Sequence, residues 1–253
     1  MKNLVLLLVV VLHSLAAIAQ NEALFNRATT YYNEGEYEKA SENYFKIIEN
    51  GEHSAEVYYN LGNCYYKLNQ IAPSIYYYEK ALLLKPNDRE IKNNLAYAQN
   101  MTLDAFEPLP ETSLSKLYKN ITGLLSFDQW SYAGVLFVFL FVLAYILFYY
   151  LRYSTHKRIA FITSIVSLFI AIFCIVLAMI QFQDFEADMP AIVFSEELIV
   201  KSEPNNRSAQ AFLLHEGTKV FVLDELDDWK KIELKDGKTG WVPSGEIKLL
   251  KDF

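Results

Sequence analysis

Cysteine is scarce in this sequence, since only Cys64 and Cys174 occur among 253 residues. Two cysteines in separate segments cannot form a disulfide framework or a cysteine-ligated metal site. The four histidines also lie in four separate segments, so no pair of them is placed to ligate zinc. We therefore expect no metal and no cofactor.

Positive charge is also in short supply, and recognisable catalytic motifs are missing. The formal net charge is -7, whereas nucleic-acid binding needs a basic face, so we expect no nucleic acid partner. The chain has only 9 glycines and contains no phosphate loop, nucleophile elbow or glycine-rich dinucleotide fingerprint. We predict no catalytic residues and a protein that is not an enzyme.

Hydrophobic residues are abundant instead, at 53% of the chain, and they gather in three blocks. The first block follows Lys2, is apolar from Leu4 to Leu12 and ends at Ala17-Ile18-Ala19. This order of charge, apolar core and small residues is typical of a secretory signal peptide, which we assign to residues 1–19. The alternative is an uncleaved anchor helix, although the apolar run is shorter than the roughly 20 residues that a spanning helix needs.

The second and third blocks are long enough to cross a membrane. Residues 130–151 and 159–182 contain no charged side chain, and about 20 apolar residues in a helix span the hydrocarbon core of a bilayer. The loop between them, residues 152–158, carries three fixed positive charges and no acidic residue. By the positive-inside rule this loop is cytoplasmic. We predict a multi-pass protein of the inner (cytoplasmic) membrane, with both large flanking domains on the periplasmic side.

Small residues recur along the second span at alternating spacings of four and three. Small side chains let helices pack closely in lipid. One interpretation is packing within the hairpin, against aromatic side chains of the first span. The other is docking of a helix from another membrane protein. The stripe consists of Ala160, Ser164, Ser167, Ala171, Cys174 and Ala178.

An internal repeat with an offset of 34 residues follows the signal peptide. Gly62 and Ser74 would let two helices approach closely, and Asn69 stands where the second copy needs a left-handed turn residue. These features resemble the tetratricopeptide repeat, whose helical hairpins stack on one another. We predict an all-α domain over residues 20–102, with repeats at 21–54 and 55–88 and a capping helix at 89–101.

The resemblance implies a concave face, lined by the first helix of each repeat, that binds a peptide and does no chemistry. Phe25 and Tyr59 occupy positions where the carboxylate clamp of some relatives needs lysine. We expect an aromatic groove in which Asn63 hydrogen-bonds to an extended or helical peptide. The alternative is that these side chains only cover the capping helix or contact lipid headgroups. Lys80 and Lys85, on the second helix, are expected to face outward. The predicted groove residues are Phe25, Tyr32, Tyr59, Asn63, Tyr66 and Tyr97.

Residues 103–129 link the repeats to the first span. Apolar side chains between Leu114 and Leu125 recur at helical spacing, which predicts an interfacial amphipathic helix. Ser126 or Asp128 can cap the helix that follows.

The pattern changes from helical to strand spacing after Pro190. Short apolar runs alternate with turn signals such as Asp236-Gly237. Trp229 and the segment Gly240-Trp241-Val242-Pro243 resemble the bacterial SH3 family, so we predict an SH3-like barrel over residues 190–250. We interpret Trp229 and Trp241 as core residues, the alternative being a ligand platform. The resemblance leaves peptidoglycan and partner proteins open as ligands.

The order of these modules resembles the BatE family of aerotolerance-operon proteins. The predicted fold class is a multidomain membrane protein with an all-α tetratricopeptide repeat domain, an α-helical transmembrane hairpin and an all-β SH3-like barrel. The resemblance implies a non-enzymatic envelope scaffold that works beside a MoxR-type ATPase and Bat-type proteins with von Willebrand A domains. The alternative is an anchor or sensor that binds peptidoglycan.

Overall fold

The computed structural model describes residues 19–106, 109–110 and 112–252. The predicted signal peptide, apart from Ala19, lies outside the described residues. The chain forms two compact units, of which one combines residues up to Leu109 with residues from Met189 onward, and the other holds Pro110–Asp188. The chain thus leaves the first unit, builds the second and then returns to the first.

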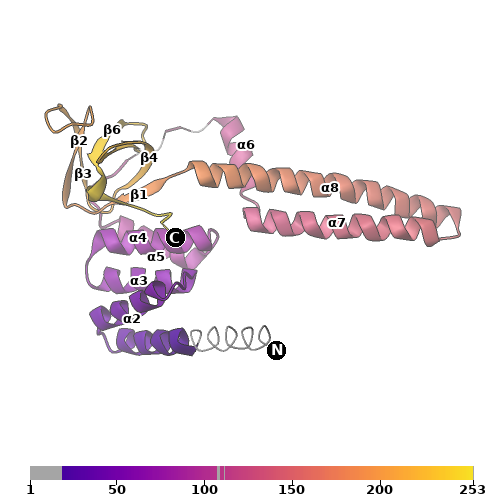
Figure 1. The fold of residues 1–253 in the computed structure, drawn as a ribbon, viewed down its shortest axis with the longest axis horizontal. Helices are drawn as coiled ribbons and strands as arrows, with labels where there is room; N and C mark the ends of the chain where they lie inside the picture. The colour runs from indigo at the N-terminus through magenta and orange to yellow at the C-terminus, as the bar shows by residue number, and fades with distance from the viewer. Residues whose placement is uncertain (1–18, 107–108, 111, 253) are drawn as a thin grey trace, which may run out of the picture. The chain divides into compact units, whose positions relative to one another are not determined.

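Helices stacked in hairpins form the amino-terminal part of the first unit, which we call the repeat domain (residues 19–102) (Figure 1). The turn residues Gly35 and Asn69 have φ angles of 82° and 59°. Asn69 therefore adopts the left-handed conformation that the sequence predicted for it. The helices are residues 19–33, α2 (Tyr37–Glu49), α3 (Ala55–Lys67), α4 (Ile71–Leu84) and α5 (Arg89–Gln99).

The two helices of the second repeat touch at Gly62. The Ser74 hydroxyl donates a hydrogen bond of 3.0 Å to the Gly62 carbonyl. A Cβ atom on Gly62 would lie 2.5 Å from Cδ1 of Tyr78, well inside contact distance. Tyr78 and Leu61 are 1% and 0% exposed. The small residues at positions 62 and 74 therefore permit the close packing that the repeat pattern predicted.

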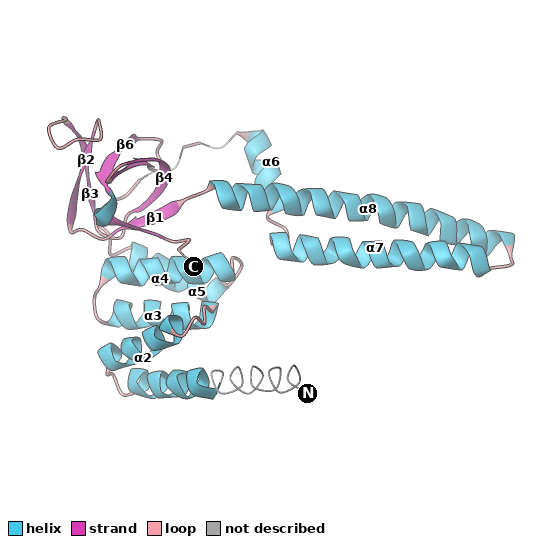
Figure 2. Ribbon diagram, in the orientation of Figure 1, coloured by secondary structure: helices cyan, strands magenta, loops and turns pink. Residues whose placement is uncertain are grey.

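The carboxy-terminal part of the first unit, which we call the sheet domain (residues 189–252), is an antiparallel sheet of 7 strands (Figure 2). The strand order is β3-β2-β6-β5-β4-β1-β7. The core includes Val200, Leu214, Ile232 and Val242, each 0% exposed. The strands are β1 (Pro190–Val193), β2 (Glu197–Lys201), β3 (Gln210–His215), β4 (Lys219–Leu226), β5 (Trp229–Glu233), β6 (Thr239–Pro243) and β7 (Ile247–Leu249).

The repeat domain and the sheet domain share a core. Ile75 and Tyr76 of α4 belong to the same cluster of buried residues as Ile192 of β1 and Leu250. The rings of Tyr76 and Phe194 meet edge to face, with centroids 5.6 Å apart. Each fully buried side chain of this size stabilises the fold by about 1.5–3 kcal/mol. The sequence pattern predicted two separate domains and carried no signal for this contact.

The second unit contains α6 (Ser113–Thr122), α7 (Phe127–Tyr150) and α8 (Ser154–Ala187). Ser126 caps α7, because its side chain accepts from Gln129 N–H while the Gln129 side chain accepts from Ser126 N–H. Both α7 and α8 are long and apolar enough to cross a membrane, and few of their residues are buried. A poorly buried apolar helix is unlike the core helix of a soluble protein.

The small-residue stripe of α8 lies against α7. All of its six residues are buried. A Cβ atom on Gly134 of α7 would lie 3.6 Å from both the Ala171 carbonyl oxygen and the Cys174 Cβ. Trp130 and Phe137 of α7 pack with Cys174 and Ala178. This placement matches the interpretation of packing within the hairpin, and another helix would have to displace α7 to reach the stripe.

Candidate functional site: the repeat face and its joint with the sheet domain

Phe25 and Tyr32 lie on the first helix of the first repeat, and both are half-buried. The Phe25 ring packs edge to face on Tyr44, with ring centroids 5.4 Å apart. The Tyr32 ring packs in the same way on Tyr37, with ring centroids 5.2 Å apart. One edge of each ring is therefore held by α2, which fixes its orientation on the predicted groove.

Tyr59 and Asn63, on α3, join a polar network with α5. The Tyr59 hydroxyl donates to Glu90 Oε1 at 2.7 Å and accepts from Asn94 Nδ2 at 2.8 Å. Asn63 Oδ1 accepts from Asn94 Nδ2 at 2.9 Å and from the Tyr78 hydroxyl at 2.6 Å. Burial, together with the hydrogen bond to Glu90, raises the pKa of Tyr59 to about 12, so this hydroxyl stays protonated at neutral pH. The side-chain oxygen of Asn63 is therefore engaged by both α4 and α5.

The sequence analysis missed Glu90 and Asn94, because α5 was interpreted only as a capping helix. The available signal was their spacing of one helical turn, which places both residues on one face of α5. Tyr66 is half-buried against the repeat core, whereas Tyr97 is 62% exposed. The structure thus brings Tyr59 and Asn63 into one network and leaves Tyr97 open to solvent.

Two ion pairs hold the sheet domain against α4. Lys80 Nζ pairs with Asp252, which also accepts a hydrogen bond of 2.8 Å from the Tyr76 hydroxyl. Lys219 Nζ lies 2.7 Å from Glu79 Oε2. The expectation that Lys80 faces outward is wrong, because its side chain is only 6% exposed beneath the sheet domain. We call the contact between the repeat domain and the sheet domain the joint. Because buried ion pairs cost desolvation and stabilise little, we attribute the stability of the joint to its apolar core. The two ion pairs set how the two domains align.

Asp104, just after α5, forms a third polar contact across the joint. Its carboxylate accepts from His215 N–H at 2.7 Å, from His215 Nδ1 at 2.8 Å and from the Thr218 hydroxyl at 2.6 Å. Burial alone would raise the pKa of Asp104, but the hydrogen bonds from Thr218 and His215 outweigh it and hold that pKa below its usual value. Burial would also raise the pKa of Asp252. The hydrogen bonds from Lys80 and Tyr76 outweigh this effect, so the pKa of Asp252 is lowered too.

We predict that the joint is stable at neutral pH and loosens in acid. Because the folded-state pKa values of Asp104 and Asp252 lie below the unfolded value of about 3.9, their contribution is complete above that pH and is lost as pH falls through the folded values. Protection of β1 and α4 amides from hydrogen exchange, measured relative to the unfolded chain at the same pH, should stay high from about pH 7 to 5 and fall below about pH 4. The same loss of protection on acidification in Asp104→Asn as in the wild type would contradict a role for this carboxyl.

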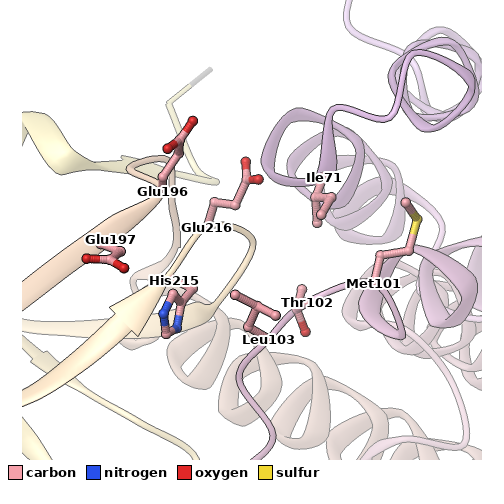
Figure 3. Close-up of a pocket in the computed structure, with 8 residues that line it drawn as sticks. All are labelled: Ile71, Met101, Thr102, Leu103, Glu196, Glu197, His215 and Glu216. Carbon is pink, nitrogen blue, oxygen red and sulfur yellow. The ribbon is translucent and has the colours of Figure 1, made fainter.

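A cavity of about 410 Å³ opens where the repeat domain meets the sheet domain. Figure 3 shows Ile71, Met101 and Leu103 on the repeat side, facing Glu216 and His215 on the sheet side. His215 is held by Asp104, and the joint therefore fixes one wall of the cavity. The remaining lining residues are Thr102, Glu196 and Glu197.

The two tryptophans of the sheet domain lie outside its core. On β5 and β6 the buried positions include Ile232 and Val242, and the alternate positions are half-buried or exposed. Trp229 pairs with Pro243, and Trp241 pairs with Lys231. Since side chains alternate across a strand, both rings lie on the face opposite the core. The interpretation of Trp229 and Trp241 as core residues is therefore wrong.

The described residues contain no group of three or more histidine, cysteine, aspartate and glutamate side chains that could hold a metal ion.

Comparison with known families matches three segments of the chain. Residues 22–49 and 55–88 each match the tetratricopeptide repeat, and residues 196–248 match the bacterial SH3 domain. A search of curated proteins finds no match. The matches, together with the helices and the sheet, confirm the predicted fold class. The resemblance to the BatE family stays a prediction.

Proposed function

We propose that this protein is a non-enzymatic, membrane-anchored adaptor of the cell envelope, which captures partner proteins on its repeat domain and its SH3 domain. Both matched families are typically binding domains without catalytic activity. The observation that carries the proposal is the shared core of the two domains, with Tyr76, Ile192 and Leu250 in one cluster. Two binding modules held in a fixed relation by such a core can present one composite surface.

The hairpin of α7 and α8 bears on which side of a membrane this surface would face. If α7 and α8 cross a bilayer, the residues before and after them must lie on one side, because they pack in one core. The positive loop at residues 152–158 favours the cytoplasmic side for the tip of the hairpin. We therefore propose that both binding domains face the exterior.

A thiol-labelling experiment tests this topology. A cysteine at Ser154, which is exposed at the start of α8, should resist a membrane-impermeant maleimide in intact spheroplasts. A cysteine at Gly245, where a Cβ atom meets nothing within 4 Å, should be labelled. The native Cys64 and Cys174 are buried and give little background. Labelling at Ser154 in sealed cells would reverse the proposed orientation.

The adaptor function is tested by cross-linking in native membranes. A photo-reactive residue in place of Tyr97, which is 62% exposed on α5, should yield a discrete product that mass spectrometry identifies. The same residue in place of Glu42, on α2, serves as the control. By resemblance, a partner with a von Willebrand A domain or a MoxR-type ATPase complex would place the protein in a Bat-type assembly. Equal products from both positions, or none from either, would count against capture on the repeat face.

Peptidoglycan binding is the second candidate function. It is favoured by Trp229 and Trp241, whose rings lie on the outer face of the sheet, where aromatic rings can stack on a ligand. The full chain in detergent should then sediment with purified peptidoglycan, and Trp241→Ala should release it. Sedimentation that is unchanged by Trp241→Ala would exclude this face as the binding site.

A further inference from the structure

Two cavities on the repeat domain occupy equivalent places in the two repeats. The first has a volume of about 290 Å³ and the second about 320 Å³. Six lining residues of the first cavity correspond, at the repeat offset of 34, to six lining residues of the second. The corresponding pairs are Asn21 and Ala55, Glu22 and Glu56, Phe25 and Tyr59, Ser54 and Asp88, Glu56 and Glu90, and Val57 and Ile91.

In each cavity one aromatic ring lies with two glutamates that correspond at the repeat offset, and the first cavity has Glu52 in addition. Phe25 lies with Glu22 and Glu56 in the first cavity, and Tyr59 lies with Glu56 and Glu90 in the second, so Glu56 lines both. The second ring is held in place, because its hydroxyl donates to Glu90 at 2.7 Å. The equivalence of the two cavities therefore extends from their position to their chemistry.

Polar contacts also fix the wall of the first cavity. Asn21 Nδ2 donates to Glu52 Oε2 at 2.7 Å, and Asn21 Oδ1 accepts from Asn50 Nδ2 at 2.7 Å. In the second cavity, Asp88 accepts from the backbone N–H groups of Glu90 and Ile91 at the start of α5. Both walls are thus set before a ligand arrives.

The charge of the two cavities selects the sign of the ligand. Their lining includes five carboxylates and one ammonium group, that of Lys85. A carboxylate and the face of an aromatic ring both attract an ammonium or guanidinium group, whereas the carboxylates would repel a carboxylate ligand. The occupant complementary to this surface is cationic. The five carboxylates are Glu22, Glu52, Glu56, Asp88 and Glu90.

We propose that the repeat domain binds a basic segment of its partner, with two lysine or arginine side chains that enter the two equivalent cavities and share Glu56. This inference rests on the proposed function, since it specifies the chemistry of the partner that the repeat face captures. The acidic surface proposed here is opposite in charge to the carboxylate clamp, which this chain lacks.

The test measures fluorescence anisotropy of labelled synthetic peptides with the full chain in a neutral detergent. The probes carry two lysines, one lysine or two glutamates, on flexible spacers of varied length. The two-lysine peptide should bind at least about tenfold more tightly than the one-lysine peptide at its best spacing, because the second contact becomes intramolecular. Raising the salt concentration from about 50 to 300 mM should weaken it, and the two-glutamate peptide should not bind.

Single substitutions locate the site. Glu56→Gln should weaken the two-lysine peptide about tenfold, since it removes a charged partner from both cavities. The matched control is Glu42→Gln, which makes the same charge change at an exposed position of α2 that lines neither cavity. Its effect should stay within about twofold, as for an ordinary surface charge.

Several results would overturn the inference. Equal losses in Glu56→Gln and Glu42→Gln would mean that only the overall negative charge attracts the peptide. Equal affinity for one and two lysines would mean that the cavities do not act together, and binding of the two-glutamate peptide would refute the charge argument. If Glu56→Gln keeps the cross-link from the Tyr97 position in native membranes, the adaptor function stands and only the basic-segment inference fails.

Discussion

Replacing Gly62 with leucine is expected to unfold the repeat domain while leaving the hairpin of α7 and α8 helical. The first side-chain atom alone would lie 2.5 to 2.9 Å from three ring atoms of Tyr78. Tyr78 is 1% exposed, and its hydroxyl donates a hydrogen bond to Asn63. The surrounding core and this hydrogen bond both hold the ring in place. Overpacking a core in this way costs about 3 kcal/mol or more, which is a large share of the stability of a small domain.

Hydrogen exchange of the full chain in detergent measures this effect directly. Backbone amides of α3 and α4 should lose protection in Gly62→Leu, whereas those of α7 and α8 should keep it. Gly245→Leu is the matched control, because a Cβ atom at Gly245 has nothing within 4 Å and should leave protection unchanged. Wild-type protection of α3 in Gly62→Leu would show that the two helices are not packed this closely in solution.

Replacing Gly217 with valine should separate the sheet domain from the repeat domain. Gly217 has a φ angle of +82°, and a Cβ atom there would lie 2.9 Å from Ile75 Cδ1 and 2.9 Å from Thr102 Cγ2. A β-branched residue in this conformation costs about 1–2 kcal/mol, and overpacking against buried Ile75 adds about 1–3 kcal/mol. The combined cost falls on the joint, since Gly217 is where the turn between β3 and β4 meets α4.

Gly35→Val separates the two parts of this cost. Gly35 has the same φ angle of +82°, but a Cβ atom there meets nothing within 4 Å. It should therefore show the conformational strain without the collision. Exchange of β1 and α4 amides should accelerate in Gly217→Val and remain slow in Gly35→Val. Slow exchange in both variants would contradict the packing of this turn on α4.

Local patterns in the sequence predicted the parts of the fold that depend on local geometry. The repeat offset identified Gly62 and Asn69, because close helix contacts and left-handed turns restrict which residues fit. Charge-free segments identified α7 and α8, although both helices extend beyond the apolar residues that suggested them. The alternation of β5 and β6 also held the information about Trp229 and Trp241, since Ile232 and Val242 set which face is buried.

The joint between the domains could not be predicted in this way. Asp104 and His215 are separated by 111 positions, and Lys80 and Asp252 by 172. No periodicity links residues so far apart, and a lysine in a helix is ordinarily an exposed residue. Glu90 was missed for a related reason, because its role depends on Tyr59 of the neighbouring helix. The equivalence of the two cavities, by contrast, follows from the repeat offset once one cavity is known.

The insertion of the hairpin between two halves of one core also sets the order in which the protein is made. The ribosome completes the repeat domain first, and α4 then carries the uncovered side chains of Ile75 and Tyr76. Their covering residues, Ile192 and Leu250, emerge only after the hairpin, several seconds later at roughly 5 to 20 residues per second. Throughout this interval the side chains of Ile75 and Tyr76 stay uncovered, until the sheet domain folds against them. A chain that stops before Leu250 would therefore leave Ile75 and Tyr76 without one of their covering side chains.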